Sequence, residues 1–506
     1  MEPALHAHLC PHLHRLGALA GGELDEAALC ADRNPPRLLH RTRAGDDRQY
    51  IEKHPAYRRL EEVAFGEFGL AAMSHRAGVL GWPAPLPPIA KYALTYLFVQ
   101  AEFGVCCPLS MTDSLARTLR RFGNAALVAR YLPGLTSQDM DALVQGAMFM
   151  TERQAGSDVG ATATRAVRDG ERWQLYGDKW FCSNPDAGVA LVLARPEGAR
   201  AGTKGLSLFL LPARTEEGVP NRYRIVRLKD KLGTRDLASG EIILEGATAY
   251  LVGDPEQGFR QMADMINMSR LSNGMRAAGM MRRALTEALY VARRREAFGR
   301  RLVELPLMRR QLLKLMVATE AARSVLFYTA TELAKADAGD EAARIRVRLL
   351  TPLLKFRACR DARRVAGDAM EVRGGVGYIE EFSDARILRD AHLGSIWEGT
   401  SNIIALDVLR AIGREGALDP LLEALPAGPL ERAAEFARAA DERHARQAAS
   451  GLYYAVAAAL LEREGARMAR RSLLSKLVER HKLQARDPFD RDNDADGDEL
   501  LEEDAL

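Results

Sequence analysis

Hydrophobic positions in the first part of the chain recur at helical spacing. Tyr57, Leu60 and Val63 are one example, and a cluster of prolines between residues 83 and 88 interrupts the pattern. This spacing is typical of amphipathic helices that bury one face. The sequence therefore predicts a helical N-terminal domain over residues 1–145.

The spacing then changes to short apolar runs that glycines separate. Val189–Leu193 and Leu206–Leu211 are two of these runs, with Gly188 before the first and Gly205 before the second. Their length and composition are typical of buried β-strands bounded by turns. We therefore expect a small β domain over residues 146–255.

Long amphipathic stretches return after residue 255. Met275–Arg295 and Leu307–Ala334 are long enough to be helices of a bundle, which we expect over residues 256–414. Residues 415–486 are rich in Ala, Leu and Arg and predict an appended helical segment. Because 506 residues exceed what one hydrophobic core holds, three or four packed units are expected.

The composition indicates a cellular compartment and shows an uneven distribution of charge along the chain. Hydrophobic residues make up 47% of the chain, but no run approaches the roughly 20 apolar residues that a membrane span needs. The cysteines show no CxxC spacing and no leader pattern stands at the start, so we expect a cytoplasmic protein without membrane contact. The net charge is +3, yet residues 487–506 hold ten acids and one arginine. We expect this acidic tail to be disordered.

Four short motifs carry candidate chemistry. In Trp397–Thr400 a carboxylate precedes a glycine, which lets a substrate approach the backbone. Met150–Val159 supplies small and hydroxyl residues that suit contact with a flat cofactor. Arg295–Gly299 and Gly374–Tyr378 are the other two. In order and spacing these motifs resemble the acyl-CoA dehydrogenase family of flavoproteins, over about residues 34–414.

Details of four segments resemble the AidB-like branch of that family, named for an alkylation-response protein. The resemblance implies an α+β, mainly α fold with an N-terminal helical domain, a middle β-barrel-like domain and a C-terminal four-helix bundle, followed here by the appended helices. It also implies FAD as cofactor and assembly into homodimers or homotetramers. The four segments are Thr151–Gln154, Lys179–Ser183, Arg227–Gly233 and Ser395–Gly399.

The reaction implied by the resemblance is α,β-dehydrogenation of an acyl-CoA thioester, a step of fatty acid metabolism. A flavin is required because no side chain accepts hydride, and an electron-transfer flavoprotein or similar acceptor would take the electrons onward. Glu398 matches the family's base for the α-proton, and Gly399 leaves room for the acyl chain. Arg270 is expected either to assist the substrate or Glu398, or to form a surface ion pair.

The cofactor contacts also follow from the resemblance. Arg295 matches an arginine that reaches the cofactor pyrophosphate of a neighbouring subunit, and a planar guanidinium suits phosphate. Ser157 is expected where cofactor and substrate meet. Phe181 matches a residue that stacks on the flavin, although an aromatic residue in a β-run more commonly belongs to the core. The predicted cofactor residues are Met148, Met150, Thr151, Ser157, Phe181, Ser183, Arg295, Phe298, Glu371, Gly374, Gly375, Thr400 and Asn402.

Two other functions remain open. One is a flavin oxidase acting on a non-CoA substrate such as a nitroalkane, against which Glu398 argues because such relatives tend to use aspartate. The other is a DNA-associated flavoprotein, since basic residues of the appended segment form a candidate phosphate footprint, which neighbouring acids and the acidic tail oppose. These basic residues are Arg463, Arg467, Arg470, Arg471, Lys476, Arg480, Lys482 and Arg486.

Two patterns resemble the spacing of metal ligands, but neither is interpreted as a metal site. Asp492–Glu503 fits most of a calcium-loop pattern, but too few residues follow it for an exit helix. Near the start, alternating ligand-type residues would share one face only in an extended strand. They are His6, His8, Cys10, His12 and His14.

Overall fold

The computed structural model describes residues 2–483 and divides the chain into two compact units, residues 1–269 and 270–506. This division is coarser than the three or four packed units that the sequence predicts. In the first unit the helices pack directly on the sheet: the backbone N–H of Gly146 donates to Thr112 Oγ1 at 2.9 Å. In the second unit the appended helices pack on the bundle, where the Tyr454 hydroxyl donates to Asp361 Oδ2 at 2.6 Å. Neighbouring predicted domains within each unit are thus in direct contact.

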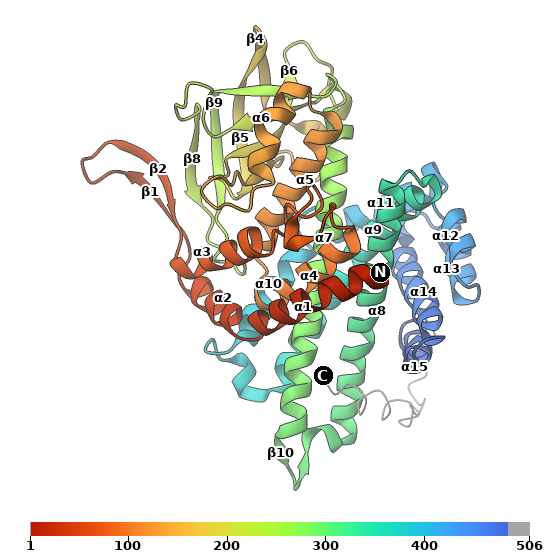
Figure 1. Cartoon of the computed structure of the whole chain (residues 1–506). Helices are drawn as coiled ribbons and strands as arrows, with labels where there is room; N and C mark the ends of the chain where they lie inside the picture. Colours follow the sequence, from red (N-terminus) through yellow and green to blue (C-terminus); the bar gives the residue numbers. More distant parts are fainter. Residues whose placement is uncertain (1, 484–506) are drawn as a thin grey trace. The chain divides into compact units, whose positions relative to one another are not determined.

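The N-terminal residues of the first unit are mainly helical. Tyr57, Leu60 and Val63 are buried, which confirms that their spacing marks a helical face. The structure adds a hairpin, β1 (Arg37–Arg41) and β2 (Asp47–Glu52), which extends away from its own unit's helices (Figure 1). The helices are α1 (Pro3–Ala20), α2 (Glu23–Arg33), α3 (Pro55–Glu61), the π-helical η1 (Glu62–Glu67), the 3₁₀ turn η2 (Val79–Gly81), α4 (Pro88–Ala101), α5 (Cys106–Phe122) and α6 (Ala125–Leu135).

The middle of the first unit is a closed sheet. Its strands follow the hydrogen-bonded order β3-β6-β4-β5-β9-β7, with β8 on β9, and β7 also pairs with β6. This last pairing closes a ring, so the predicted barrel-like domain is confirmed. The strands are β3 (Gly146–Phe149), β4 (Arg165–Asp169), β5 (Arg172–Ser183), β6 (Val189–Pro196), β7 (Ser207–Pro212), β8 (Tyr223–Leu228) and β9 (Ser239–Val252); short 3₁₀ turns η3 (Val159–Ala161) and η4 (Thr203–Gly205) lie in the loops.

A buried ion pair anchors the loop between β3 and β4. Lys179 Nζ on β5 lies 2.7 Å from Glu152 Oε1, and the two side chains are 0% and 1% exposed. Burial would raise the pKa of Glu152, but the Lys179 ammonium lowers it. The carboxylate also accepts hydrogen bonds from the backbone N–H groups of Ala163 at 2.7 Å and Thr164 at 3.1 Å. One carboxylate therefore ties both ends of the loop that contains Ser157 to the sheet.

The second unit is built from long helices. α7 crosses the division between the units. The predicted helix at residues 275–295 lies within α7 except for Arg295, and the one at residues 307–334 lies within α8. None of the helices within residues 2–483 combines the length and hydrophobicity needed to span a bilayer. The elements are α7 (Gly258–Arg294), the hairpin β10 (Glu296–Ala297) and β11 (Arg300–Arg301), η5 (Leu302–Glu304), α8 (Pro306–Asp337), α9 (Glu341–Val372), η6 (Gly374–Tyr378), α10 (Ser383–Gly394) and α11 (Ser401–Glu415).

The appended segment is helical as far as the structure describes it. Arg471, one residue of the candidate DNA footprint, is buried and its guanidinium Nη1 lies 2.5 Å from Glu320 Oε2. Arg471 therefore stabilises the contact between α15 and α8 and is not available to phosphate. Arg486 and the predicted tail at residues 487–506 lie outside the described residues. The elements are α12 (Asp419–Ala424), α13 (Pro429–Ala439), η7 (Glu442–His444), α14 (Ala445–Gly465), α15 (Arg470–Val478) and η8 (Glu479–Leu483).

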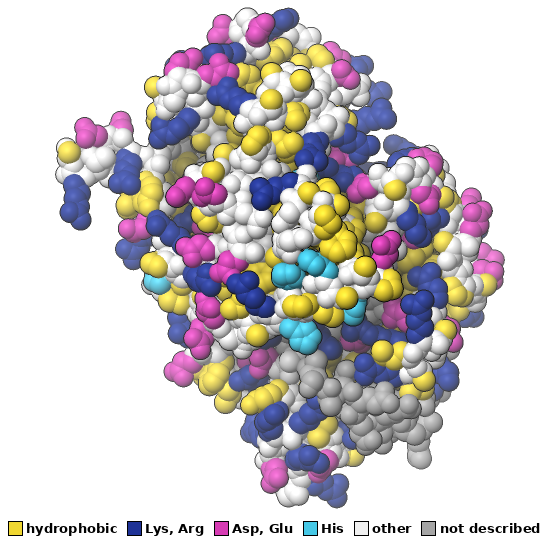
Figure 2. All heavy atoms as spheres, in the orientation of Figure 1, with side chains coloured by type: hydrophobic (Ala, Val, Ile, Leu, Met, Phe, Trp, Pro, Cys, Tyr) yellow, Lys and Arg dark blue, Asp and Glu magenta, His cyan; other side chains and the backbone are white. Residues whose placement is uncertain are grey.

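The histidine-rich start is helical rather than extended. Figure 2 shows histidine side chains at the surface over α1, and His8 Nε2 lies 3.0 Å from the Leu80 carbonyl oxygen. Because successive side chains of a helix point about 100° apart, alternation does not collect them on one face. Among the described residues no three potential ligands are grouped as a metal site.

Lys179→Met is expected to lower the free energy of unfolding by about 3–5 kcal/mol, because the Glu152 carboxylate would remain buried without its ammonium partner. Chemical denaturation followed by circular dichroism measures the change. Arg165→Met is the matched control, since Arg165 pairs with Glu197 at the surface and its loss should cost less than about 1 kcal/mol. Equal losses in the two variants would contradict the anchoring role of Lys179.

Candidate functional site

In the first unit, a bulge in β5 turns Phe181 outward. Lys179 pairs with Ile242 and Cys182 with Gly240, so two residues of β5 oppose one residue of β9. Phe181 has a φ of 55° and its side chain is 61% exposed, while Cys182 is buried. The alternative that Phe181 belongs to the core is therefore wrong. An exposed ring on strained backbone is typical of a functional contact.

The other flavin-type residues of the first unit lie around this bulge. The backbone N–H of Trp180 donates to the Thr151 carbonyl at 2.8 Å, which places Thr151 beside the Phe181 segment. Ser183, two residues beyond Phe181, has its hydroxyl 3.5 Å from that of Ser239. An exposed aromatic ring with nearby hydroxyls suits a flat, polar ring system such as the isoalloxazine of a flavin.

The remaining predicted residues of this unit occupy the end of β3 and the loop after it. Met148 lies on β3 and is half-buried. Met150 follows the strand, and its carbonyl accepts a hydrogen bond from Lys179 Nζ at 3.4 Å. Ser157 is exposed in the anchored loop. The buried Glu152–Lys179 pair therefore supports the whole segment, a role that the motif alone did not reveal.

In the second unit, Glu398 lies in a tight turn between α10 and α11. Its φ is 56°, and that of Gly399 is 100°. A left-handed backbone at a non-glycine residue costs on the order of 1–3 kcal/mol, so the surroundings must hold it. A side chain at Gly399 would bring its Cβ within 2.9 Å of Ile404 Cδ1. The glycine is therefore favoured mainly by its left-handed conformation, since the end of the Ile404 side chain is the group that would have to shift.

Two cations hold the carbonyl groups of this turn. Arg270 Nε on α7 donates to the Glu398 carbonyl at 3.1 Å, and Lys355 Nζ on α9 donates to the Gly399 carbonyl. Arg270 is itself fixed by Asp407 on α11, at 2.8 Å. Both members of that ion pair are largely buried, with side chains 15% and 11% exposed. The surface ion pair considered for Arg270 is therefore wrong, and Arg270 supports the Glu398 turn.

The residue before Glu398 is also anchored. Trp397 Nε1 donates to Asn273 Oδ1 on α7 at 2.6 Å, and the Arg276 guanidinium lies 4.8 Å from the centre of the Trp397 ring. Asn273, Lys355 and Asp407 stand outside the recognised motifs. Lys355 did carry a signal, because it interrupts an apolar run with a charge.

Arg295 and Gly374 lie side by side in the second unit. Arg295 Nη1 donates to the Arg373 carbonyl at 3.3 Å, and a Cβ on Gly374 would lie 3.3 Å from the same nitrogen. Glu371 and Gly375 are exposed nearby. A glycine-lined backbone beside an exposed guanidinium suits a phosphate-bearing ligand.

Phe298 occupies the tip of the β10–β11 hairpin. Its φ is 53° and its side chain is 94% exposed. The following Gly299 also has positive φ, at 70°, so both central residues of the turn are left-handed, as a two-residue hairpin requires. A phenylalanine this exposed fits a contact made outside the chain's own fold.

Thr400 and Asn402 occupy the start of α11. Thr400 is the N-cap residue and Asn402 lies in the first turn, and both are exposed. The unpaired N–H groups and the dipole of a helix N-terminus favour anions. These two positions therefore suit the phosphate side of a dinucleotide cofactor.

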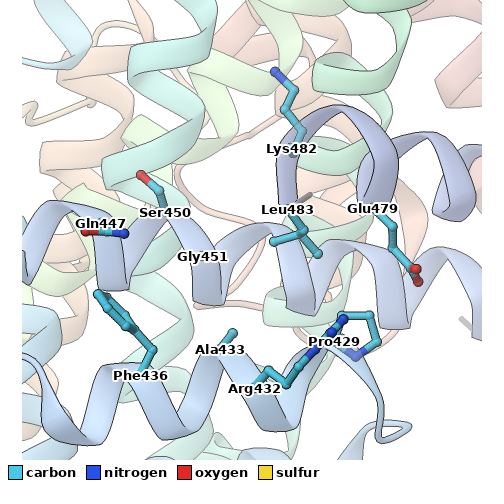
Figure 3. Close-up of a pocket in the computed structure, with 10 residues that line it drawn as sticks. All are labelled: Pro429, Arg432, Ala433, Phe436, Gln447, Ser450, Gly451, Glu479, Lys482 and Leu483. Carbon is cyan, nitrogen blue, oxygen red and sulfur yellow. The ribbon is translucent and has the colours of Figure 1, made fainter. Parts of the chain in front are cut away.

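A hollow of about 770 Å³ lies in the appended segment, between α13, α14 and η8. Figure 3 shows Phe436 directed from α13 toward α14, while Lys482 points away from the other lining residues. None of the predicted cofactor or substrate residues lines this hollow. It is therefore separate from the candidate site.

Three segments of the chain match known domains. Residues 3–142 match the N-terminal domain of the adaptive response protein AidB, residues 147–247 the acyl-CoA dehydrogenase middle domain, and residues 256–413 the acyl-CoA dehydrogenase C-terminal domain. The order is that of the helical, β and helical segments described above.

Relatives support the same assignment. The chain is 35% identical to the putative acyl-CoA dehydrogenase AidB of Escherichia coli (strain K12), over 80% of this chain and 74% of that protein. It is 34% identical to acyl-CoA dehydrogenase family member 11 of Caenorhabditis elegans, over 80% of this chain and 67% of that protein. The structure of Caenorhabditis elegans ACDH-11 in complex with C11-CoA has a TM-score of 0.84 at 27% identity, covering 95% of this chain and 88% of that chain. The chain therefore belongs to the acyl-CoA dehydrogenase family of FAD-dependent oxidoreductases, within its AidB-like branch.

Proposed function

We propose that this protein catalyses FAD-dependent α,β-dehydrogenation of an acyl-CoA thioester, with Glu398 as the base for the α-proton. The observation that carries the proposal is the strained Glu398–Gly399 turn, whose two carbonyl groups are held by Arg270 and Lys355. A carboxylate-bearing residue on strained backbone that largely buried charges hold in place is typical of an active site. A similar protein from Caenorhabditis elegans has been solved with C11-CoA, which supports an acyl-CoA as substrate.

Proton removal needs a base and a donor to the thioester oxygen. Glu398 supplies the carboxylate. In the acyl-CoA dehydrogenase family the backbone N–H of the catalytic glutamate is one of the donors to the thioester oxygen. That N–H belongs to the peptide that follows Trp397, which is anchored on Asn273. Because the C=O and N–H of a trans peptide point in opposite directions, the hold of Arg270 on the Glu398 carbonyl turns the Gly399 N–H away from Arg270. Arg270 therefore fixes the orientation of the Glu398–Gly399 peptide before any substrate binds.

FAD, when bound, supplies the hydride acceptor that the protein lacks. We assign its ring to the Thr151, Phe181 and Ser183 segment, with Met148, Met150 and Ser157 along the adjoining strand and loop. Thr400 and Asn402 would hold its phosphates at the N-terminus of α11. Ser157, Arg270 and Gly399 would contact or support the substrate. Electrons would leave through an electron-transfer flavoprotein or a similar acceptor.

The active form is proposed to be a homodimer or homotetramer. Arg295, Phe298 and the Gly374–Gly375 backbone would meet the adenosine diphosphate part of a cofactor bound mainly by another subunit, with Glu371 beside it. The exposed Phe298 ring supports this, as do further exposed apolar side chains of the second unit. They include Leu307, Val376, Tyr378 and Ile379.

Glu398→Gln is expected to keep bound FAD but to slow flavin reduction by acyl-CoA by roughly 10²–10⁴-fold, because an amide cannot take the proton. Anaerobic stopped-flow absorbance of the flavin measures the rate across a panel of acyl-CoAs. Binding of acyl-CoA should still perturb the flavin spectrum. Glu381→Gln, an exposed acid before α10, is the control and should react like the unaltered protein. Bleaching of Glu398→Gln at the unaltered rate would remove Glu398 as the base.

Arg295→Ala is expected to weaken FAD binding by about 10- to 100-fold, since a charge-assisted hydrogen bond contributes about 1.5–3 kcal/mol. FAD retention during gel filtration, with light scattering for mass, measures cofactor and assembly together. Arg294→Ala is the matched control, because the Arg294 guanidinium stacks 3.8 Å from the Tyr290 ring of its own helix. A fully flavinated, active monomer would contradict the shared site.

A further inference from the structure

Lys355 is an unusual lysine because it is buried without a carboxylate partner. Lys355 belongs to α9, and only 1% of the residue is exposed. Buried lysines are rare unless paired, since removing an ammonium from water is costly. Among the described residues no acid lies within ion-pair distance of Lys355, and its hydrogen bond goes to the Gly399 carbonyl. A buried ammonium group without a carboxylate partner suggests a functional role for Lys355.

Three ionisable groups lie near the Lys355 ammonium. Cys359 lies one turn along α9, Glu398 comes from the turn, and Arg270 comes from α7. Burial lowers the pKa of Lys355 to about 8; the Glu398 carboxylate opposes this shift, and the Arg270 guanidinium adds to it. Burial also raises the pKa of Cys359 to about 11, so this thiol stays neutral while Lys355 titrates.

We propose that Lys355 is a positioning residue that holds the Glu398–Gly399 turn ready for proton transfer. Its ammonium fixes the Gly399 carbonyl and places a positive charge near the Glu398 carboxylate, favouring the ionised form that accepts a proton. The inference rests on the proposed function and deepens it. Loss of the Lys355 proton removes the charge and weakens the hold on the turn, so activity falls as the pH rises through about 8.

Stability should change in the opposite direction. A buried lysine with a lowered pKa binds its proton less well in the folded state than in the unfolded state, whose pKa is about 10.4. Between pH 8 and pH 10, stability contributed by this group therefore rises. A lysine that only fills space would affect stability alone, whereas a positioning lysine also sets the pH profile of the reaction.

Flavin reduction by acyl-CoA, measured by stopped flow from pH 6 to pH 10, tests the proposal on the holoenzyme. The unaltered protein should lose rate above about pH 8. Lys355→Met should be about 10- to 100-fold slower at pH 7, with KM for acyl-CoA within about 2-fold and without the alkaline loss. Lys355→Arg should recover most of the rate and keep it above pH 8, because a guanidinium stays charged. Lys335→Met, an exposed lysine of α8, should match the unaltered protein.

A second measurement follows the conformation of the Glu398–Gly399 turn without any reaction. The difference in tryptophan emission between the unaltered protein and Trp397→Phe isolates the signal of Trp397, the residue next to Glu398. In the unaltered holoenzyme this signal should change with an apparent pKa near 8. Lys355→Met should abolish this transition. If no acyl-CoA reduces the flavin while the emission changes as expected, the proposed reaction fails and the hold on the turn stands. The role of Lys355 would be overturned if the unaltered protein showed neither the loss of rate nor the change in emission near pH 8, a result that depends on no variant. It would also be overturned if Lys355→Met kept the rate and both transitions.

Discussion

The left-handed turn at Glu398 and Gly399 is the constraint around which the second unit is organised. A non-glycine residue at a φ of 56° does not keep that conformation unaided. Three helices supply the support: α7 provides Arg270 and Asn273, α9 provides Lys355, and α11 provides Asp407. The long helices are therefore a scaffold that brings charges from distant parts of the sequence to one turn.

The first unit uses the same physical device at Phe181. There a β-bulge exposes an aromatic ring on left-handed backbone, and the buried Glu152–Lys179 pair holds the strand and loop next to it. Buried ion pairs add little net stability compared with apolar packing, but removing one partner is costly. Such pairs therefore specify one geometry, which is what a cofactor contact and a proton-transferring carboxylate both need.

The appended helices belong to the bundle's own core. Tyr454 on α14 donates to the buried Asp361 of α9, which also binds Arg357. Arg471 on α15 pairs with Glu320 of α8. A basic residue that would be counted toward a phosphate footprint thus serves packing, because a charge count cannot tell a surface arginine from a buried one.

The sequence by itself determined the class of fold and the family, and it singled out Glu398 as the candidate base. Continuous apolar runs such as Val189–Leu193 indicate buried strands wherever they lie, and Trp397–Thr400 is recognisable because a carboxylate beside a glycine suits the proposed proton abstraction. The hairpin at residues 37–52 escaped prediction because its strands are largely exposed and polar, leaving no alternation to detect. Tertiary structure alone decided that Phe181 faces outward and that Arg270 and Lys355 meet one turn. Those contacts join residues 44 to 128 positions apart, and local periodicity carries no information about partners at such separations.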